Sequence, residues 1–247
     1  MIDLQKIVIL FDADNTQLSK LESVIREVST HGRIVVKRAY GNWKKEGLKN
    51  WEYELNRLAI KAEQQFDYVT GKNATDMALV IDAIELLHSA IYDAFVIVAS
   101  DSDYTPLSIK LHESGVYVMG IGEKKTPESF RNSCDEFIFL ENLTNDGGND
   151  SAEVNDKDDI SGDKKPVENI DEIHKLLKIA SDSYQDDDGY VNVSAAGAYI
   201  KRTKPDFDVR SYGFLKLPSL LEAYPNKYEV KKYPGKGKVI IVAYKCR

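Results

Sequence analysis

Acidic residues stand at three points of the chain where strands are predicted to end or helices to begin. FDADN (11–15) follows an apolar run, SDSD (100–103) follows another, and Asp76 opens a predicted helix. Carboxylates that lie close together repel one another unless a cation relieves the repulsion, so such a cluster predicts a divalent-ion site. None of the four histidines lies in these segments. An oxygen-only ligand set favours Mg²⁺ or Mn²⁺ over zinc.

Hard cations held by carboxylates can activate water and stabilise charge on a phosphoryl group. The predicted chemistry is therefore the hydrolysis of a phosphodiester or a phosphomonoester. A single aspartate is often only a helix cap or a turn residue, and Asp103 could cap the helix that begins near Tyr104. Three acidic clusters at strand ends favour a shared site instead. We interpret Asp82 as structural, because it lies on a different helix face from Asp76.

The elements that must position these acids alternate along the first 140 residues. Apolar runs predict five strands, and helical patterns separate them. We expect strands at 6–11, 33–40, 66–70, 94–100 and 116–122, with helices at 18–29, 51–62 and 76–87 and a fourth that ends near 113. This alternation predicts a parallel sheet with helices on both faces. Ligands of such sheets bind outside the carboxyl ends of the strands, where the acids stand.

Composition excludes several classes of protein. The chain has 247 residues, 43% of them hydrophobic and 30% charged, which is typical of a globular protein. No apolar run approaches the roughly 20 residues that span a bilayer, and the amino-terminal residues do not resemble a signal peptide. The two cysteines match no metal or redox spacing. We therefore expect a protein of the reducing cytoplasm without contact to a membrane.

Charge divides the chain into three parts. Residues 1–143 carry 16 Lys/Arg against 22 Asp/Glu, residues 144–168 carry 3 against 8, and residues 169–247 carry 14 against 10. The middle part has almost no apolar residues, so it is expected to form a flexible acidic linker between two domains. From residue 189 onward, 12 basic residues face 4 acids. Such an excess suits contact with a phosphate backbone, although it could also serve solubility alone.

A basic segment of the first domain also contains aromatic residues. Residues 33–61 carry eight Lys/Arg against three acids, with tryptophans at 43 and 51. Positive charge beside stacking rings is what single-stranded nucleic acid requires. Trp51 is expected in the core, whereas the predicted RNA contacts are Trp43, Lys44, Lys45 and, near Asp76, Lys72.

The acidic motifs resemble those of the NYN domain family, relatives of PIN-domain ribonucleases. The similarity rests on FDADN (11–15), GKNATDMALVIDA (71–83) and VIVASDSDYTPL (96–107), and covers residues 5–142. It implies a PIN-like parallel sheet of order 3-2-1-4-5, flanked by helices, and metal-dependent RNA cleavage. By position, the metal ligands and catalytic residues would be Asp12, Asp76, Asp101 and Asp103. Asn15 would be their polar companion.

One alternative for the same motif remains open. Asp12-Ala-Asp14-Asn15-Thr16 fits the Asp-x-Asp-x-Thr pattern of haloacid-dehalogenase-like phosphatases. Asp12 would then be a nucleophile and Asp14 a general acid/base. That family needs a flap after the first strand, whereas here a helix is predicted almost at once, and it offers no role for Asp76.

The carboxyl-terminal part, residues 170–233, resembles an OST-HTH or LOTUS domain. The turn at 188–191 and the segments PDFD (205–208) and RSYGFLKL (210–217) carry this resemblance. Helices at 170–181, 194–203 and 212–223 and a hairpin of 228–233 with 238–244 predict a small winged-helix-like α+β domain. The family implies RNA binding or, in some members, docking onto a DEAD-box helicase. Tyr212 and Phe214 are expected in the core, and the candidate phosphate contacts are Lys201, Arg202, Lys204, Arg210 and Lys216.

Together these observations predict a nuclease domain at 1–143, an acidic linker at 144–168 and an RNA-binding domain at 169–247. The predicted activity is Mg²⁺- or Mn²⁺-dependent hydrolysis of RNA. A non-catalytic adaptor that binds RNA without cutting it is the alternative, because catalysis depends on geometry at the level of 1 Å.

Overall fold

The computed structural model describes residues 4–67, 73–143, 170–235 and 240–247. It divides into two compact units, Met1–Asn145 and Asp146–Arg247, and each is described by itself. The predicted linker at 144–168 and Lys72 lie outside the described residues.

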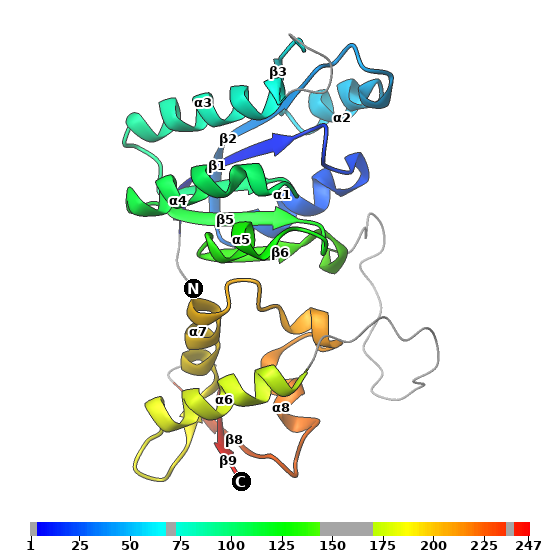
Figure 1. Ribbon diagram of the computed structural model, residues 1–247. Helices are drawn as coiled ribbons and strands as arrows, with labels where there is room; N and C mark the ends of the chain where they lie inside the picture. The colour runs from blue at the N-terminus through cyan, green and yellow to red at the C-terminus, as the bar shows by residue number, and fades with distance from the viewer. Residues whose placement is uncertain (1–3, 68–72, 144–169, 236–239) are drawn as a thin grey trace, which may run out of the picture. The chain divides into compact units, whose positions relative to one another are not determined.

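The first unit is built on a six-stranded parallel sheet in the order β3-β2-β1-β4-β5-β6 (Figure 1). The predicted order 3-2-1-4-5 is confirmed, and a sixth strand pairs with β5. All five strand pairs are parallel. The strands are β1 (Leu4–Asp12), β2 (Gly32–Gly41), β3 (Lys61–Gln64), β4 (Ala94–Val98), β5 (Tyr117–Gly122) and β6 (Glu136–Phe139).

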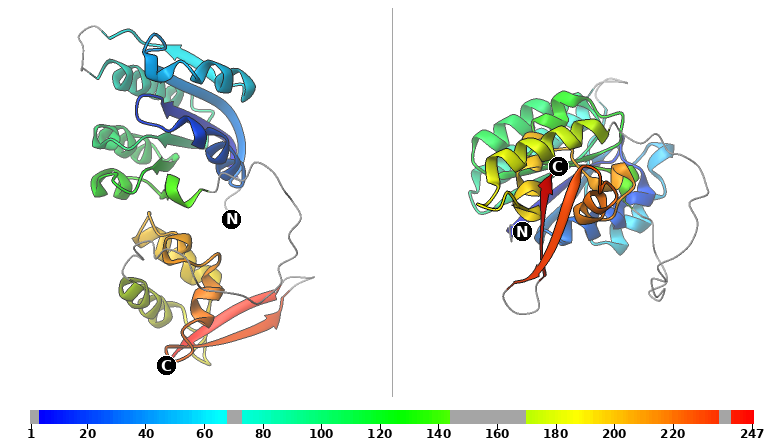
Figure 2. Two further views of the ribbon diagram at one scale, coloured as in Figure 1. Left: turned by 90° about the vertical axis from the view of Figure 1, so that its right-hand side faces the viewer. Right: turned by 90° about the horizontal axis from the view of Figure 1, so that it is seen from below.

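Helices cover both faces of this sheet, because the central strands are apolar on both sides. Along β1, Ile7, Ile9 and Phe11 face one core, and Val8 and Leu10 face the other. Helices α1 (Leu21–Ser29) and α2 (Trp51–Arg57) pack on the first core. Helices α3 (Ala74–His88), α4 (Thr105–Glu113) and α5 (Glu128–Asn132) pack on the second (Figure 2).

Two predictions of secondary structure in this unit are wrong. The third strand is Lys61–Gln64 and not 66–70, of which 68–70 lie outside the described residues. This strand is at the edge of the sheet and largely exposed, so its sequence KAEQ carries no apolar run. The helix predicted at 51–62 ends at Arg57, and Ala59 takes a φ of 51° before β3 begins. The last strand, β6, was not predicted.

Short 3₁₀ helices surround the carboxyl ends of the strands. They are η1 (Leu18–Lys20), η2 (Glu46–Leu48) and η3 (Ser102–Tyr104), and η4 (Leu140–Asn142) follows β6. Only residues 13–17 separate β1 from η1, so no flap follows the first strand. This agrees with the early helix that the sequence predicts.

The second unit packs helices on a three-stranded antiparallel sheet of order β7-β9-β8, as expected for a winged-helix-like domain. It contains α6 (Ile170–Tyr184), β7 (Val191–Asn192), α7 (Val193–Thr203), η5 (Val209–Tyr212), α8 (Leu217–Glu222), β8 (Tyr228–Pro234) and β9 (Ile240–Cys246). Strands β8 and β9 run side by side as the hairpin (Figure 2). The third helix does not span 212–223, because Gly213 adopts a left-handed φ of 83° between η5 and α8.

Two further features of the sequence have structural counterparts. Both cysteines are free, and burial raises the pKa of the Cys134 thiol to about 11. Among the described residues, none of the helices combines the length and apolar character required to cross a bilayer.

Candidate functional site

Asp12 is the last residue of β1 and is completely buried. Its carboxylate accepts the backbone N–H of Asp14 at 3.1 Å and Nδ2 of Asn15 at 2.8 Å. Burial raises the pKa of Asp12 to about 6; the hydrogen bond from Asn15 opposes this rise, and the charges of Asp76 and Asp14 add to it. A buried carboxyl with raised pKa at a strand end is typical of a functional site.

Tyr104 links two of the acids. Its buried hydroxyl donates to Asp76 Oδ1 at 2.8 Å and also hydrogen-bonds with Asp12. Burial raises the pKa of Asp76, while the Tyr104 hydrogen bond opposes the rise. The charges of Asp101 and Asp103 raise it further. Acids from β1, α3 and the segment after β4 therefore act on one another electrostatically.

Asp101 and Asp103 lie on the turn that leads from β4 into η3. Asp101 accepts the backbone N–H of Asp103 at 3.0 Å and caps η3, so the cap is Asp101 and not Asp103. The Asp103 carboxylate accepts Nδ2 of Asn73 at 2.6 Å. Asn73 occupies the N-cap position of α3. Thr75 lies in the first turn and donates to Asp14 at 3.2 Å.

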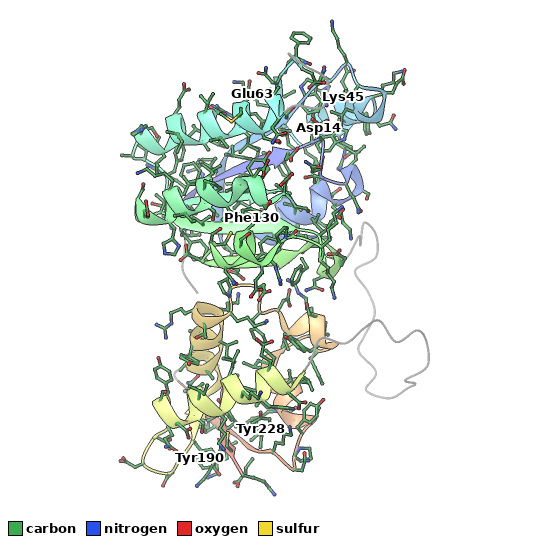
Figure 3. The ribbon with its side chains drawn as sticks, in the orientation of Figure 1. Asp14, Lys45, Glu63, Phe130, Tyr190 and Tyr228 are labelled. Atoms are coloured by element: carbon green, nitrogen blue, oxygen red, sulfur yellow. The ribbon has the colours of Figure 1, made fainter. Side chains whose placement is uncertain are left out.

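Lys45 approaches the acids from the loop after β2. Its Nζ lies 3.1 Å from Asp14 and 3.5 Å from Asp67. Figure 3 shows Lys45 and Asp14 close together at the carboxyl ends of the strands. One ammonium group thus partly neutralises this side of the acidic cluster.

The donor set fits a hard cation in its chemistry, because every candidate ligand is a carboxylate. The positions of these carboxylates fit a metal ion less well than their chemistry does. Within residues 4–67, 73–143, 170–235 and 240–247, no group of three or more His, Cys, Asp or Glu is arranged to hold a metal ion. Hydrogen bonds hold the carboxylates instead: Asn15 binds Asp12, Asn73 binds Asp103, and Tyr104 joins Asp12 to Asp76.

The predicted RNA contacts of the first unit occupy different environments. Trp43 packs on the core, its ring centroid 6.0 Å from that of Trp51. Its buried Nε1 has no hydrogen-bond partner among the described residues. Trp51 is buried, as predicted. Lys44 is exposed and lies 5.0 Å from the ring centroid of Phe66.

The basic candidates of the second unit fall into two groups. Lys201 and Arg202 are exposed at the end of α7, and Lys216 is exposed before α8. Lys204 instead pairs with Glu172 at 3.1 Å, and Arg210 pairs with Asp208 at 2.8 Å. As predicted, Tyr212 is buried and Phe214 packs against the core.

Sequence reasoning missed two side chains that hold the acids in place, Tyr104 and Asn73. It also missed Asp67, whose carboxylate binds Lys45 beside them. Tyr104 directly follows Asp103, but neighbouring position gives no sign that its hydroxyl reaches back to Asp12. Asp82, in contrast, was predicted correctly as structural. Its carboxylate binds the Arg38 guanidinium at 2.5 Å and the Tyr40 hydroxyl.

The parallel sheet of this order, with acids at its carboxyl edge, defines a PIN-like α/β domain, and a winged-helix-like domain follows it. The family model of the NYN domain matches residues 6–141, and that of the OST-HTH/LOTUS domain matches residues 168–240. The chain belongs to the NYN domain family and carries an OST-HTH/LOTUS domain after it. NYN domains have a ribonuclease-like fold, and OST-HTH domains bind RNA.

Three solved structures show partial similarity. A protein of unknown function from Vibrio parahaemolyticus has 19% identity and a TM-score of 0.45, over 54% of this chain and 91% of the other. An uncharacterized protein from Nitrosomonas europaea has 21% identity and a TM-score of 0.28, over 41% and 91%. MurG of Acinetobacter baumannii has 10% identity and a TM-score of 0.38, over 55% and 40%. No curated protein matches the chain.

Proposed function

We propose that this protein is a metal-dependent ribonuclease that hydrolyses RNA phosphodiester bonds in its NYN domain. The observation that carries the proposal is the buried Asp12 carboxyl, raised in pKa to about 6 and joined to Asp76 through the Tyr104 hydroxyl. Burial of carboxylates that repel one another lowers the stability of the folded protein. A catalytic role of these acids explains why the fold contains such an arrangement.

Asp12, Asp76, Asp101 and Asp103 would hold Mg²⁺ or Mn²⁺. When bound, such an ion supplies an activated water and stabilises charge on the phosphoryl group. Asn15 would orient Asp12 through its 2.8 Å hydrogen bond. The expected products carry 5′-phosphate and 3′-hydroxyl ends, as the family implies.

Basic residues of both domains would guide the RNA. In the first domain these are Lys44, Lys45 and Lys72; in the second domain they are Lys201, Arg202, Lys204, Arg210 and Lys216. A linker at 144–168 would raise the concentration of RNA near the nuclease domain. We further propose a cytoplasmic location, where thiols stay reduced. Binding of a protein partner is a second proposed role for the LOTUS domain.

Cleavage of labelled single-stranded RNA in Mn²⁺ tests the proposal. The wild-type chain should cleave, and Asp101→Asn should lower the rate by at least 100-fold, on the scale of losing a principal electrostatic group. Glu113→Gln is the matched control, because Glu113 is an exposed acid at the end of α4. RNA that stays intact with the wild-type chain, or equal rates for wild type and Asp101→Asn, would contradict the proposal.

A non-catalytic RNA-binding adaptor is the second candidate function. It is favoured by the hydrogen bonds that already engage the acids, and by the lack of a three-ligand group among the described residues. Measurable RNA binding without cleavage would support it. For the phosphatase alternative, robust turnover of p-nitrophenyl phosphate that Asp12→Asn abolishes would replace the nuclease proposal.

A further inference from the structure

Phe66 is an exposed aromatic side chain near the acidic cluster. It lies two residues after the end of β3, and 53% of its surface is accessible. A single exposed apolar side chain needs no special explanation. The surroundings of this one, however, give it the components of a nucleic-acid contact.

The backbone around Phe66 is fixed to the loop after β2. Gln64 Oε1 accepts the backbone N–H of Trp43 at 3.1 Å, and its Nε2 donates to Asn42 Oδ1 at 3.1 Å. Asn42 in turn donates to Asp67 at 3.2 Å. The backbone N–H of Gln65 also donates to the Gly41 carbonyl at 3.1 Å. The chain next to Phe66 is therefore anchored to the end of β2 and to the loop after it, which lowers the entropy that a stacked ligand would remove.

Two lysines connect this ring with the acids. Lys44 Nζ lies 5.0 Å from the Phe66 ring centroid. Lys45 Nζ contacts both Asp67, the neighbour of Phe66, and Asp14 of the acidic cluster. One ammonium group thus spans the distance between the segment that carries the ring and the candidate site. A ring beside positive charge is the combination that binds a base and its phosphates in single strands.

We propose that Phe66 is a stacking platform for an unpaired base next to the scissile phosphodiester, with Lys44 and Lys45 beside the backbone of that nucleotide. This inference rests on the proposed nuclease function and specifies its substrate as single-stranded RNA, because bases within a duplex offer no free face for stacking. The role falls to Phe66, whereas Trp43, the aromatic residue that the sequence suggested, is partly buried against the core.

Binding of RNA with single abasic sites tests the proposal. The full chain with Asp101→Asn, which should bind without cutting, is titrated with single-stranded RNAs that lack one base at successive positions. Phe66→Ala should weaken binding of intact RNA about tenfold, as expected for one lost base–aromatic contact. One abasic position should weaken binding to the Phe66 chain by a similar factor and leave binding to the Phe66→Ala chain unchanged.

Two variants serve as controls. Phe66→Trp should restore affinity, because a larger ring can stack in its place. Tyr53→Ala should have no effect, since this exposed aromatic residue lies on α2 and contributes nothing to the proposed platform. Equal affinities for Phe66 and Phe66→Ala, or an abasic penalty that both chains share at every position, would overturn the inference.

The result is separable from the nuclease proposal. If one abasic position weakens binding only when Phe66 is present, but the wild-type chain leaves RNA intact in Mn²⁺, the stacking proposal stands and the nuclease proposal is contradicted. If the wild-type chain cleaves RNA and Phe66→Ala leaves KM unchanged, the nuclease proposal stands and the stacking proposal is contradicted.

Discussion

Asp12→Asn exchanges a completely buried carboxyl for an amide of the same shape. In the folded protein the pKa of Asp12 is about 6, against an ordinary value of 3.8. Well below pH 3.8 the carboxyl is protonated in both folded and unfolded chains and costs no stability. Between about pH 4 and pH 6 the unfolded chain ionises this carboxyl while the folded chain keeps it protonated, so the wild-type protein loses stability across this range, and the loss is complete above pH 6. The asparagine variant avoids this loss.

The size of the effect follows from the two pKa values. A difference of about two pH units corresponds to about 3 kcal/mol of unfolding free energy. Asp14, Asn15 and Tyr104 all hydrogen-bond to the Asp12 carboxyl, and the amide has one acceptor oxygen in place of two, so one of these partners is lost, at a cost of about 1 kcal/mol. We therefore expect Asp12→Asn to stabilise the first unit by about 2 kcal/mol at pH 7.5. The unfolding temperature should rise by about 4–8 °C.

Tryptophan fluorescence during urea unfolding in EDTA measures this effect in the intact chain. The chain has two tryptophans, Trp43 and Trp51, and both belong to the first unit, so the signal reports that unit alone. Glu113→Gln should leave the unfolding midpoint unchanged at both pH 7.5 and pH 4. A destabilised Asp12→Asn variant at pH 7.5, or a gain that is equally large at pH 4, would refute the reasoning.

Three further predictions concern other parts of the structure. Tyr104→Phe keeps the buried ring but removes the hydroxyl that joins the two acids; RNA cleavage should fall at least tenfold while circular dichroism stays unchanged, and an unchanged rate would contradict this role. Asp82→Ala leaves the guanidinium of Arg38 without its nearest partner and should lower the urea stability of the first unit by about 1–3 kcal/mol; an unchanged midpoint would show that the pair contributes nothing. Lys216→Ala should reduce the slope of log affinity against log salt by about 0.7, the value for one phosphate contact on a single strand; fluorescence anisotropy at several salt concentrations measures it. Lys175→Ala, which replaces an exposed lysine of α6 outside the proposed contacts, should leave the slope unchanged, and equal slopes for wild type and Lys216→Ala would contradict this contact.

The central elements of the fold could be predicted because each carries a strong local pattern. β1 and β4 are continuous apolar runs, and the acids after them identify the carboxyl edge of the sheet. β3 could not be predicted, since KAEQ is a mostly exposed edge strand whose position depends on pairing with β2. The strand predicted at 66–70 rested on its aromatic and β-branched residues, and of that segment residues 68–70 lie outside the described part of the chain.

For the candidate site, the motifs indicate which acids follow the strands, but they do not indicate the side chains that surround these acids. Motif spacing brought Asp12 and Asp76 to one edge of the sheet, because parallel topology determines where strand ends meet. The Tyr104 hydroxyl and the roles of Trp43 and Phe66 depend on tertiary packing. The sequence placed Trp43 in a basic segment and Phe66 in a predicted strand, and only the packing of Trp43 against Trp51 identifies which ring is covered.

Calorimetric titration of Mn²⁺ into the metal-free chain at pH 7.5 tests most directly whether acids of three separate segments form one ion site. We predict saturable binding to the wild-type chain. Asp12→Asn, Asp76→Asn and Asp101→Asn should each weaken that binding at least tenfold, and Glu113→Gln should preserve it. Binding should also weaken at pH 5, where Asp12 retains its proton. No uptake of Mn²⁺ or Mg²⁺ by the wild-type chain, or equal uptake by the three asparagine variants, would contradict the account.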